Sequence, residues 1–351
     1  MSCDPISTNP MQSIECIAFV NNPISQRMLL ATLREEGIDR SKSVLFVLRA
    51  IDRQTWWDDF AFTIVYPLKA SLSIVGQAKF LPFYWVAAST LRAALRSPNL
   101  RYLVVINNDN MLTNHALGAT ASRTDCRVIV IAEGLMNYQD IRLANRAKWR
   151  NQLRPVVSGL LGLRWHHPLG HLSGAFEPNV HMVYAFAGPG LFAPLEKRRI
   201  IPFDPVEPNV ASESETVLFI ETALWQWMSE VEFKIFADRF AEWLKSMKPA
   251  RLLIKPHPNY PPSVYLRSLL PKFEILADQE SVESMANRIA AARVVGFCCT
   301  GLVTLAMLRP DIRCFDFGHD YYLDRAYRGD KTLIGLLKSA GVQLVDFSST
   351  A

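Results

Sequence analysis

Short apolar runs alternate along the chain with segments in which apolar residues recur every three or four positions. The apolar runs predict buried strands, and the periodic segments predict helices with one buried face. Strands are expected at 15–20, 42–50, 101–107, 127–134, 215–222, 250–258, 293–297 and 312–317. Helices are expected at 26–36, 83–96, 230–247, 282–292 and 300–308. This alternation predicts an α/β protein with parallel sheets and helices on both faces of each sheet.

The length of 351 residues favours two domains, because a single core of this size is unusual. The segment 187–215 is rich in proline and polar residues and is expected to be the inter-domain linker. We therefore expect an N-terminal domain at 1–200 and a C-terminal domain at 201–351.

Composition narrows the class of protein. Half of the residues are hydrophobic and 20% are charged, which is typical of a globular protein. The six cysteines show no CxxC spacing, so neither a disulfide framework nor a zinc site is expected. Neither a signal-peptide pattern nor an apolar run of about 18 residues is found, so a cytoplasmic protein is expected. The net charge of +5 is compatible with acidic substrates or an anionic membrane surface.

A histidine stands between two prolines where the predicted strand 250–258 ends. Pro256 and Pro258 restrict the backbone on both sides of His257, which gives the imidazole a stiff mount. Ligands of open parallel sheets bind outside the carboxyl ends of the strands. His257 is therefore a candidate group for contact with a reacting atom, and Lys255 precedes it.

A second candidate follows the strand at 127–134. Glu133 and Gly134 come directly after its apolar residues. Glycine permits a sharp turn beside a ligand, and a carboxylate at that place can act as a general base.

A third candidate is a glycine followed by small residues and a helix. Gly296 ends the predicted strand 293–297, and a helix is expected from Thr300. Free backbone N–H groups and the positive end of a helix dipole favour an anion there, and Thr300 can serve as the N-cap or bind a phosphate oxygen. Together the three candidates are suited to displacing a phosphate leaving group with an activated hydroxyl.

Other polar residues follow predicted strands. Asn21, Asn22 and Asn108 are candidate ligand-binding residues of the N-terminal domain. Glu221 and Thr222 are candidate ligand-binding residues of the C-terminal domain. Asn107, Asp109, Asp316 and His319 occupy comparable positions but are ranked lower, since polar loops are common.

The segment 141–176 contains six Lys or Arg residues and no Asp or Glu. Arg146 and Arg150 lie in it, next to Trp149. This composition fits an acidic acceptor or the inner face of a membrane. A nucleic-acid partner is not expected, because the charge is local and no binding motif is present.

Three short stretches then resemble a known family. Bacterial sialyltransferases, including the α-2,8-polysialyltransferase-like group, carry an Asp/Glu-Asp/Glu-Gly motif, a His-Pro motif and a Ser-Ser/Thr motif in this order. The matching stretches are Ala132-Glu133-Gly134, His257-Pro258 and Cys298-Cys299-Thr300. The resemblance extends over roughly residues 14 to 318, and its specificity comes from the set of motifs.

The resemblance implies a GT-B fold, in which two Rossmann-like domains have parallel sheets that face a central cleft. It implies an inverting, metal-independent transfer of sialic acid from CMP-sialic acid to a glycan hydroxyl, in bacterial surface polysaccharide or lipooligosaccharide synthesis, without a cofactor. Glu133 would be the general base, with His257 at the leaving phosphate and Gly134, Arg146 and Arg150 at the acceptor. The donor would be bound by Lys255, Pro258, Gly296, Cys298, Cys299, Thr300, Asn21, Asn22, Asn108, Glu221 and Thr222.

Two departures from the family pattern keep alternatives open. Ala132 replaces the first acidic residue, so Asp109 and Asp140 are alternative bases. Cysteines replace the usual serine, which leaves Thr300 as the hydroxyl of that motif. The alternatives are transfer of another CMP-activated acid sugar such as Kdo, and a non-catalytic protein that binds a nucleotide sugar or glycan. The acceptor, which the composition suggests is acidic or lipid-linked, and the oligomeric state stay open.

Overall fold

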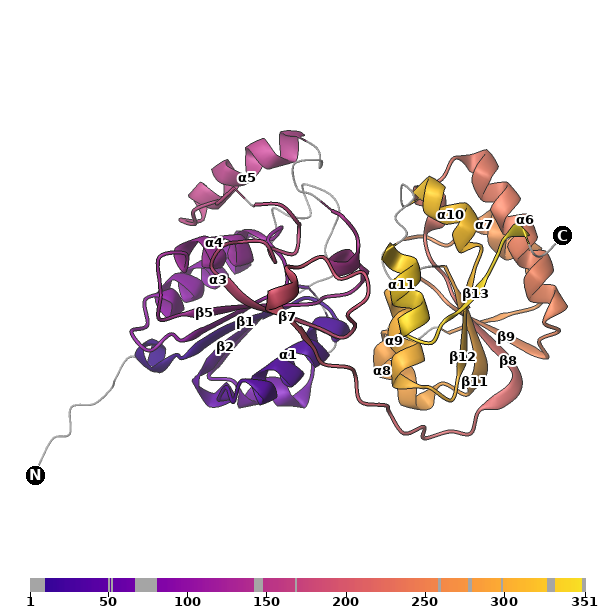
Figure 1. Cartoon of the computed structure of the whole chain (residues 1–351), viewed down its shortest axis with the longest axis horizontal. Helices are drawn as coiled ribbons and strands as arrows, with labels where there is room; N and C mark the ends of the chain where they lie inside the picture. The colour runs from indigo at the N-terminus through magenta and orange to yellow at the C-terminus, as the bar shows by residue number, and fades with distance from the viewer. Residues whose placement is uncertain are drawn as a thin grey trace, which may run out of the picture. The chain divides into compact units, whose positions relative to one another are not determined.

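The computed structural model describes residues 10–49, 51, 53–66, 81–141, 148–167, 169–257, 260–276, 280–297, 299–326 and 332–348. The chain forms two compact units (Figure 1). The first comprises Met1–Phe186 and Phe192–Ile201, and the second comprises Ala187–Leu191 and Pro202–Ala351. Among the described residues, each unit contains one parallel sheet with helices against it.

The sheet of the first unit has seven parallel strands in the order β3-β2-β1-β4-β5-β6-β7. Their bounds are β1 Cys16–Val20, β2 Ser43–Val47, β3 Phe62–Val65, β4 Tyr102–Val105, β5 Arg127–Ile131, β6 Val180–Ala185 and β7 Arg198–Ile200. Every residue of β1 and β2 is buried, as expected for strands covered on both faces. From β1 the chain adds β2 and β3 on one side, and it then returns to add β4 on the other side of β1. In such sheets ligands bind at this switch point, between β1 and β4.

Four α-helices of the first unit are α1 (Pro23–Glu35), α3 (Leu81–Leu95), α4 (Met111–Ala119) and α5 (Lys148–Leu160). In Figure 1, α1 lies on one side of the sheet and α3 and α4 lie on the other. Asn22 begins α1 through a capping box with Ser25, and Pro23 occupies the first helical turn. The first buried strand is thereby followed at once by a helix N-terminus.

The sheet of the second unit has six parallel strands in the order β10-β9-β8-β11-β12-β13. Their bounds are β8 Glu213–Ile220, β9 Arg251–Lys255, β10 Glu274–Ile275, β11 Ala291–Gly296, β12 Arg313–Phe317 and β13 Gln343–Val345. The helices are α6 (Glu230–Ser246), α7 (Val264–Leu269), α8 (Val282–Met285), α9 (Thr300–Leu308), α10 (His319–Ala326) and α11 (Thr332–Ser339). Phenylalanines fill the core, and the rings of Phe240 and Phe297 lie 4.6 Å apart.

Short 3-10 helices complete the described elements of the two units. They span Pro10–Ser13, Arg40–Lys42, Thr55–Asp59, Leu135–Tyr138, Leu195–Lys197, Leu224–Gln226 and Ala286–Arg288. In the described part of the chain, no helix combines the length and apolar character that crossing a bilayer requires.

The predicted fold class is confirmed, since both units are parallel α/β sheets of the Rossmann type. Two local predictions need correction. The chain passes from the first unit to the second between Ile201 and Pro202, inside the expected linker 187–215, but this segment also contains β7, which pairs with β6, and the first residues of β8. The helix expected at 282–292 ends as α8 at Met285, and β11 begins at Ala291. Pairing of β11 with β8 outweighs the helix propensity of its alanines, because the sheet supplies partners that a local pattern does not contain.

Candidate functional site

Polar side chains gather where the central strands of the first sheet end. Asn21 and Asn22 follow β1, Asn107 and Asn108 follow β4, and Glu133 follows β5. These three strands are neighbours and parallel, so their carboxyl ends lie at one edge of the sheet. Four of the residues predicted for the first domain, Asn21, Asn22, Asn108 and Glu133, thus follow strands that end at one edge of the sheet.

The carboxylate of Glu133 is held by amides from two other strand ends. Its Oε1 accepts a hydrogen bond from Nδ2 of Asn107 at 2.9 Å, and its Oε2 accepts one from Nδ2 of Asn21. Glu133 is 5% exposed. A carboxylate has about four acceptor positions, so two such bonds leave lone pairs on both oxygens. The side chain is therefore fixed in position while it can still accept a proton.

The main chain around Glu133 is fixed by two further asparagines. Nδ2 of Asn22 donates to the Glu133 carbonyl oxygen at 2.6 Å, and the Glu133 N–H donates to Oδ1 of Asn137 at 2.9 Å. Gly134 follows with φ of 140°, a conformation that favours glycine. Ala132 is fully buried, and its N–H continues the ladder to β6 by donating to the Tyr184 carbonyl. The turn that presents Glu133 thus starts directly after the sheet ends.

Burial raises the pKa of Glu133 above its ordinary value. The hydrogen bonds from Asn21 and Asn107 and the nearby Arg49 guanidinium partly offset this rise, whereas Asp109 adds to it. A carboxyl group with a raised pKa is a stronger base when ionised, which suits proton abstraction near neutral pH.

The two alternative carboxylates differ from Glu133 in their surroundings. Asp109 forms an ion pair with Arg154 of α5. Asp140 is exposed. Of the three, Glu133 is the one whose carboxylate is buried at the end of a central strand.

Asn108 does not contact Glu133, although the sequence ranked it above Asn107. Its Nδ2 donates to Oε1 of Glu177 at 2.7 Å, and its Oδ1 accepts from Nδ2 of Asn114 at 2.7 Å. The Asn108 amide therefore ties the loop that contains Glu177 to α4. Sequence reasoning undervalued Asn107 and missed Asn137. Asn107 has the local signal of a polar residue near the end of a strand, whereas Asn137 lies in the 3-10 helix Leu135–Tyr138, six residues after β5, and has no such signal.

In the second sheet, the predicted residues again follow neighbouring strands. Glu221 and Thr222 follow β8, Lys255 ends β9, and Gly296 ends β11. The Glu221 N–H donates to the Lys255 carbonyl at 3.0 Å, which continues the β8–β9 ladder to the edge. The predicted donor-binding residues that the structure describes in this domain therefore belong to the carboxyl edge of β9, β8 and β11.

The Glu221 carboxylate forms a buried ion pair. Nη2 of Arg267 donates to Oε2 at 2.7 Å and Nε donates to Oε1 at 3.3 Å, and the Glu221 side chain has no exposed surface. Both carboxylate oxygens are engaged by α7. The contact of Glu221 with the nucleotide stays a prediction. The observed ion pair with Arg267 connects β8 to α7.

His257 is partly buried on the loop after β9. Its ring lies 4.9 Å from that of Tyr260. Burial lowers the pKa of the imidazole, so the neutral form predominates at neutral pH. Lys255, two residues earlier, is 7% exposed. A neutral imidazole has one N–H to donate, and the ammonium of lysine would add positive charge at the same edge.

The glycine–helix stretch shows how α9 begins. A Cβ atom at position 296 would lie 3.4 Å from Sγ of Cys299 and 3.7 Å from the Ile220 carbonyl oxygen, which are ordinary van der Waals contacts, so the packing there does not by itself require a glycine. Of the two roles suggested for Thr300, that of N-cap is not found: Cys299 is the N-cap with an extended backbone, and Thr300 is the first helical residue. The other role, binding of a phosphate oxygen, stays a prediction. Burial raises the pKa of the Cys299 thiol to about 12, which keeps it protonated.

Several predicted residues lie outside the described part of the chain. They are Pro258, Cys298 and Arg146. Arg150 is part of α5, but its side chain is not among those described. Their assigned roles stay predictions.

One group of side chains among the described residues has the arrangement of a metal site. Ligand atoms of His319, Asp320 and Asp346 all lie within 4.8 Å of one another. Nε2 of His319 is 3.5 Å from Oδ1 of Asp346, while Oδ1 of Asp320 accepts the Phe347 N–H at 2.7 Å. These residues follow β12 and β13, so they share the sheet edge with His257. Sequence reasoning ranked His319 low among the candidate residues and pointed to neither Asp320 nor Asp346.

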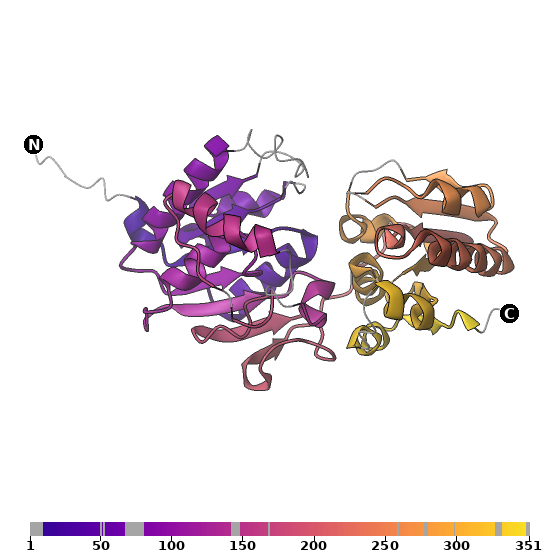
Figure 2. The ribbon, with the colours of Figure 1, turned by 90° about the horizontal axis from the view of Figure 1, so that it is seen from above.

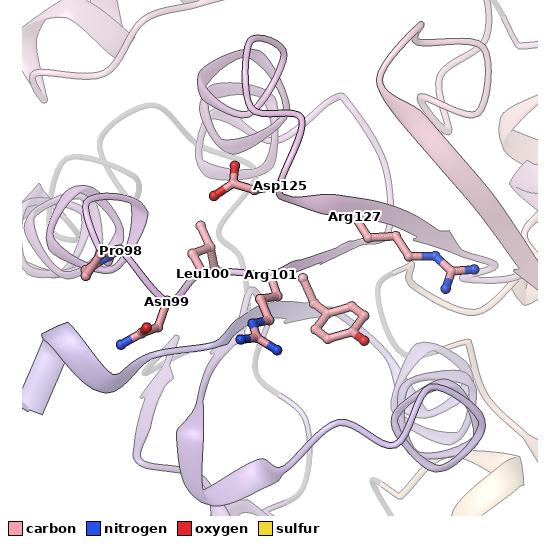
Figure 3. A pocket seen from close by; sticks show the side chains of 7 residues that line it. Pro98, Asn99, Leu100, Arg101, Asp125 and Arg127 are labelled. Atoms are coloured by element: carbon pink, nitrogen blue, oxygen red, sulfur yellow. The ribbon is translucent and has the colours of Figure 1, made fainter.

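A pocket of about 440 Å³ lies at the opposite edge of the first sheet (Figure 3). It is lined by residues that precede or begin β4 and β5, namely Pro98, Asn99, Leu100, Arg101, Tyr102, Asp125 and Arg127. Arg127 pairs with Glu36 at 2.8 Å, and Asp125 pairs with Arg123 at 2.9 Å. Because the amino ends of parallel strands lie opposite their carboxyl ends, this pocket is separate from Glu133.

Comparison with known proteins supports the fold alone. No family model matches the chain, and no curated protein matches it. An α/β-galactoside α-2,3-sialyltransferase from Photobacterium phosphoreum is similar in structure, with a TM-score of 0.51, 12% identity and coverage of 96% of this chain and 98% of that one. A 2,6-sialyltransferase from Photobacterium sp. JT-ISH-224, solved with CMP and lactose, has a TM-score of 0.52, 10% identity and coverage of 94% and 78%. The two domains thus have the architecture of GT-B glycosyltransferase structures.

Proposed function

We propose that the protein is an inverting glycosyltransferase that moves sialic acid from CMP-sialic acid to a glycan hydroxyl. The observation that carries the proposal is the buried Glu133 carboxylate, held by Asn21 and Asn107 at the carboxyl edge of a Rossmann-type sheet. The fold and the order of the three motifs agree with it. The glycan would belong to a bacterial surface polysaccharide or lipooligosaccharide assembled on the cytoplasmic side.

In the proposed reaction the first domain activates the acceptor. Glu133 takes the proton of the acceptor hydroxyl while that oxygen attacks the anomeric carbon of the donor. The bond between this carbon and the phosphate oxygen breaks, and CMP departs with the electron pair. Gly134, Arg146 and Arg150 are assigned to the acceptor. A raised pKa at Glu133 favours this role, because a base is most effective when its pKa lies near the working pH.

The second domain is assigned to the donor phosphate. Charge grows on the departing phosphate, and hydrogen-bond donors fixed in advance stabilise it at little reorganisation cost. His257 and Lys255 would supply such donors after β9, and the first N–H groups of α9 together with the Thr300 hydroxyl would supply others. This chemistry requires no metal and no cofactor, since the leaving group, CMP, is a phosphate monoester whose growing charge protein groups would stabilise.

Two alternatives share the same residues. A transferase for another CMP-activated acid sugar, such as Kdo, would use the same base and phosphate contacts. A non-catalytic protein would bind the nucleotide sugar or glycan without turnover, which the alanine at position 132 favours.

The deciding experiment is incubation of the purified protein with CMP-sialic acid and a mixture of glycan acceptors, followed by mass spectrometry. A mass increase of one or more sialic acid residues is expected, with the Glu133→Gln protein as the negative control. Transfer from CMP-Kdo alone would replace the donor assignment. Binding of CMP-sialic acid by calorimetry without transfer or hydrolysis would instead identify a non-catalytic binding protein.

A further inference from the structure

Helix α5 exposes an apolar face. Leu153, Val156, Val157 and Leu160 are 50%, 59%, 36% and 70% exposed. They follow the spacing i, i+3, i+4 and i+7, which puts them on one side of the helix. Figures 1 and 2 show α5 on the outside of the first domain. These four residues are named the α5 face below.

Another side of α5 is fixed to the domain, and it is partly polar. Arg154 pairs with Asp109, and its guanidinium lies 5.2 Å from the centre of the Trp165 ring. Ser158 is fully buried, and Leu161, just after the helix, is 1% exposed. A helix that packs on a protein core normally turns its apolar side inward. In α5 this arrangement is inverted, so the α5 face is available to a partner.

The C-terminal end of α5 is also fixed. Nη1 of Arg92 in α3 donates to the carbonyl oxygens of Leu161 and Gly162 at 3.3 Å each. The Leu163 N–H donates to the Ser158 carbonyl at 2.9 Å. These bonds oppose a rotation of α5 that would bury the α5 face in the domain.

Charge decides which class of partner fits. The segment 141–176, which includes α5, carries six Lys or Arg residues and no Asp or Glu. The whole chain carries 38 basic and 33 acidic residues, so the remainder is close to neutral. The net positive charge of the protein is therefore concentrated in the segment that presents the α5 face.

We propose that the α5 face docks on an anionic lipid bilayer, with α5 lying in the plane of the interface. Exposed aliphatic side chains in a segment that carries basic residues and no acidic ones are the composition with which helices bind such surfaces. A second copy of this chain is a poorer occupant, because a two-fold interface through α5 would bring two positive segments together. The proposal does not depend on the transfer reaction, so it can be tested without a substrate.

The test is co-sedimentation of the full chain with vesicles of phosphatidylglycerol and phosphatidylcholine, compared with vesicles of phosphatidylcholine alone. Binding is expected to the anionic vesicles, and it should weaken when salt rises from about 0.1 to 0.5 M. The double variant Leu153→Asp/Leu160→Asp should bind at least about tenfold more weakly, because both changes place a charge in the apolar face.

The matched control is Val231→Asp/Ile235→Asp, which changes two aliphatic residues of α6 that are 68% and 47% exposed. This control should bind like the unchanged protein, and circular dichroism should show both double variants folded. Equal binding by both double variants, or equal binding to both kinds of vesicle, would overturn the proposal. So would a dimer in analytical ultracentrifugation that Leu153→Asp/Leu160→Asp abolishes while the unchanged protein ignores the vesicles.

Discussion

At the residue scale, the chemistry of the first domain depends on the Glu133 carboxylate. Glu133→Gln keeps the size of the side chain and removes the base. The Glu133 carboxylate is proposed to act in the transition state. Turnover of Glu133→Gln should therefore fall by at least about a hundredfold, while the KM for the donor changes little. In the unchanged protein the acidic limb of the pH–rate profile should lie above the ordinary pKa of glutamate, and the variant should lose this limb.

Asp140→Asn is the matched control for this change, since Asp140 is an exposed carboxylate that follows the same strand. It should retain the turnover of the unchanged protein. If Asp140→Asn or Asp109→Asn abolished turnover and Glu133→Gln did not, the base would have been assigned to the wrong residue.

The same carboxylate should affect stability. A group whose pKa is raised in the folded state stabilises the fold below its unfolded pKa, and this contribution is lost as pH rises through the folded pKa. The pKa of Glu133 is raised by burial, so ionised Glu133 opposes folding at neutral pH. Relative to Glu133→Gln, the unfolding free energy of the unchanged protein should therefore increase as pH falls from 8 to about 4. Urea titrations of both proteins across this range would measure it; a difference independent of pH would contradict the raised pKa.

In the second domain, the residue on which the proposed chemistry most depends is His257. Burial lowers its pKa, so a neutral imidazole would donate its N–H to the leaving phosphate near pH 7. His257→Ala should lower turnover at least about a hundredfold, whereas His257→Gln, which can still donate, should lower it less. Single-turnover rates and donor affinity, measured on the same variants, would separate a loss in the chemical step from a loss of donor binding. An unchanged rate in His257→Ala would remove the imidazole from the reaction.

At the element scale, the start of α9 follows Gly296, the last residue of β11, and has Cys299 as its N-cap. If the first turn binds the donor phosphate, Thr300→Val should weaken CMP binding by about 1.5–3 kcal/mol, the contribution of one hydrogen bond to a charged group. Calorimetry with CMP would show this loss. Tighter binding by Thr300→Val would exclude the helix start from the donor site.

Cys299→Ser is the companion variant at the same helix start. The cysteine makes no side-chain capping hydrogen bond, whereas a serine hydroxyl is a preferred cap. The unfolding free energy should rise by up to about 1 kcal/mol, and CMP affinity should stay equal or improve.

At the scale of the whole molecule, the question is whether transfer depends on a metal ion. The proposed chemistry uses protein donors at the phosphate, so turnover should survive EDTA. Removal of a possible ion site is the control for the EDTA experiment. Such a site, among the described residues, is the group of His319, Asp320 and Asp346. A Mg²⁺-reversible loss of turnover that His319→Ala reproduces would favour a metal-dependent reaction instead.

The hydrophobic pattern of the sequence predicts the strands and helices, because their formation depends largely on neighbouring residues. The apolar runs at 15–20, 127–134 and 215–222 predicted strands because a buried strand needs only apolar residues in succession. The alternation with helices was enough to predict parallel sheets, and Glu133 and His257 could be assigned to strand ends on the same basis. The class of fold and the edge that holds the candidate site were therefore available from the sequence by itself.

Only the tertiary structure decided which side chains meet. Glu133 is bound by Asn107, 26 positions away, and by Asn21, 112 positions away. Glu221 is paired with Arg267, 46 positions later. These contacts depend on strand order and on the register of distant segments, which hydrophobic periodicity does not encode. For the same reason the pattern of α5 reveals an amphipathic helix, but its outward apolar face follows from the contacts of Arg154, Ser158 and Leu161, which fix another side to the domain.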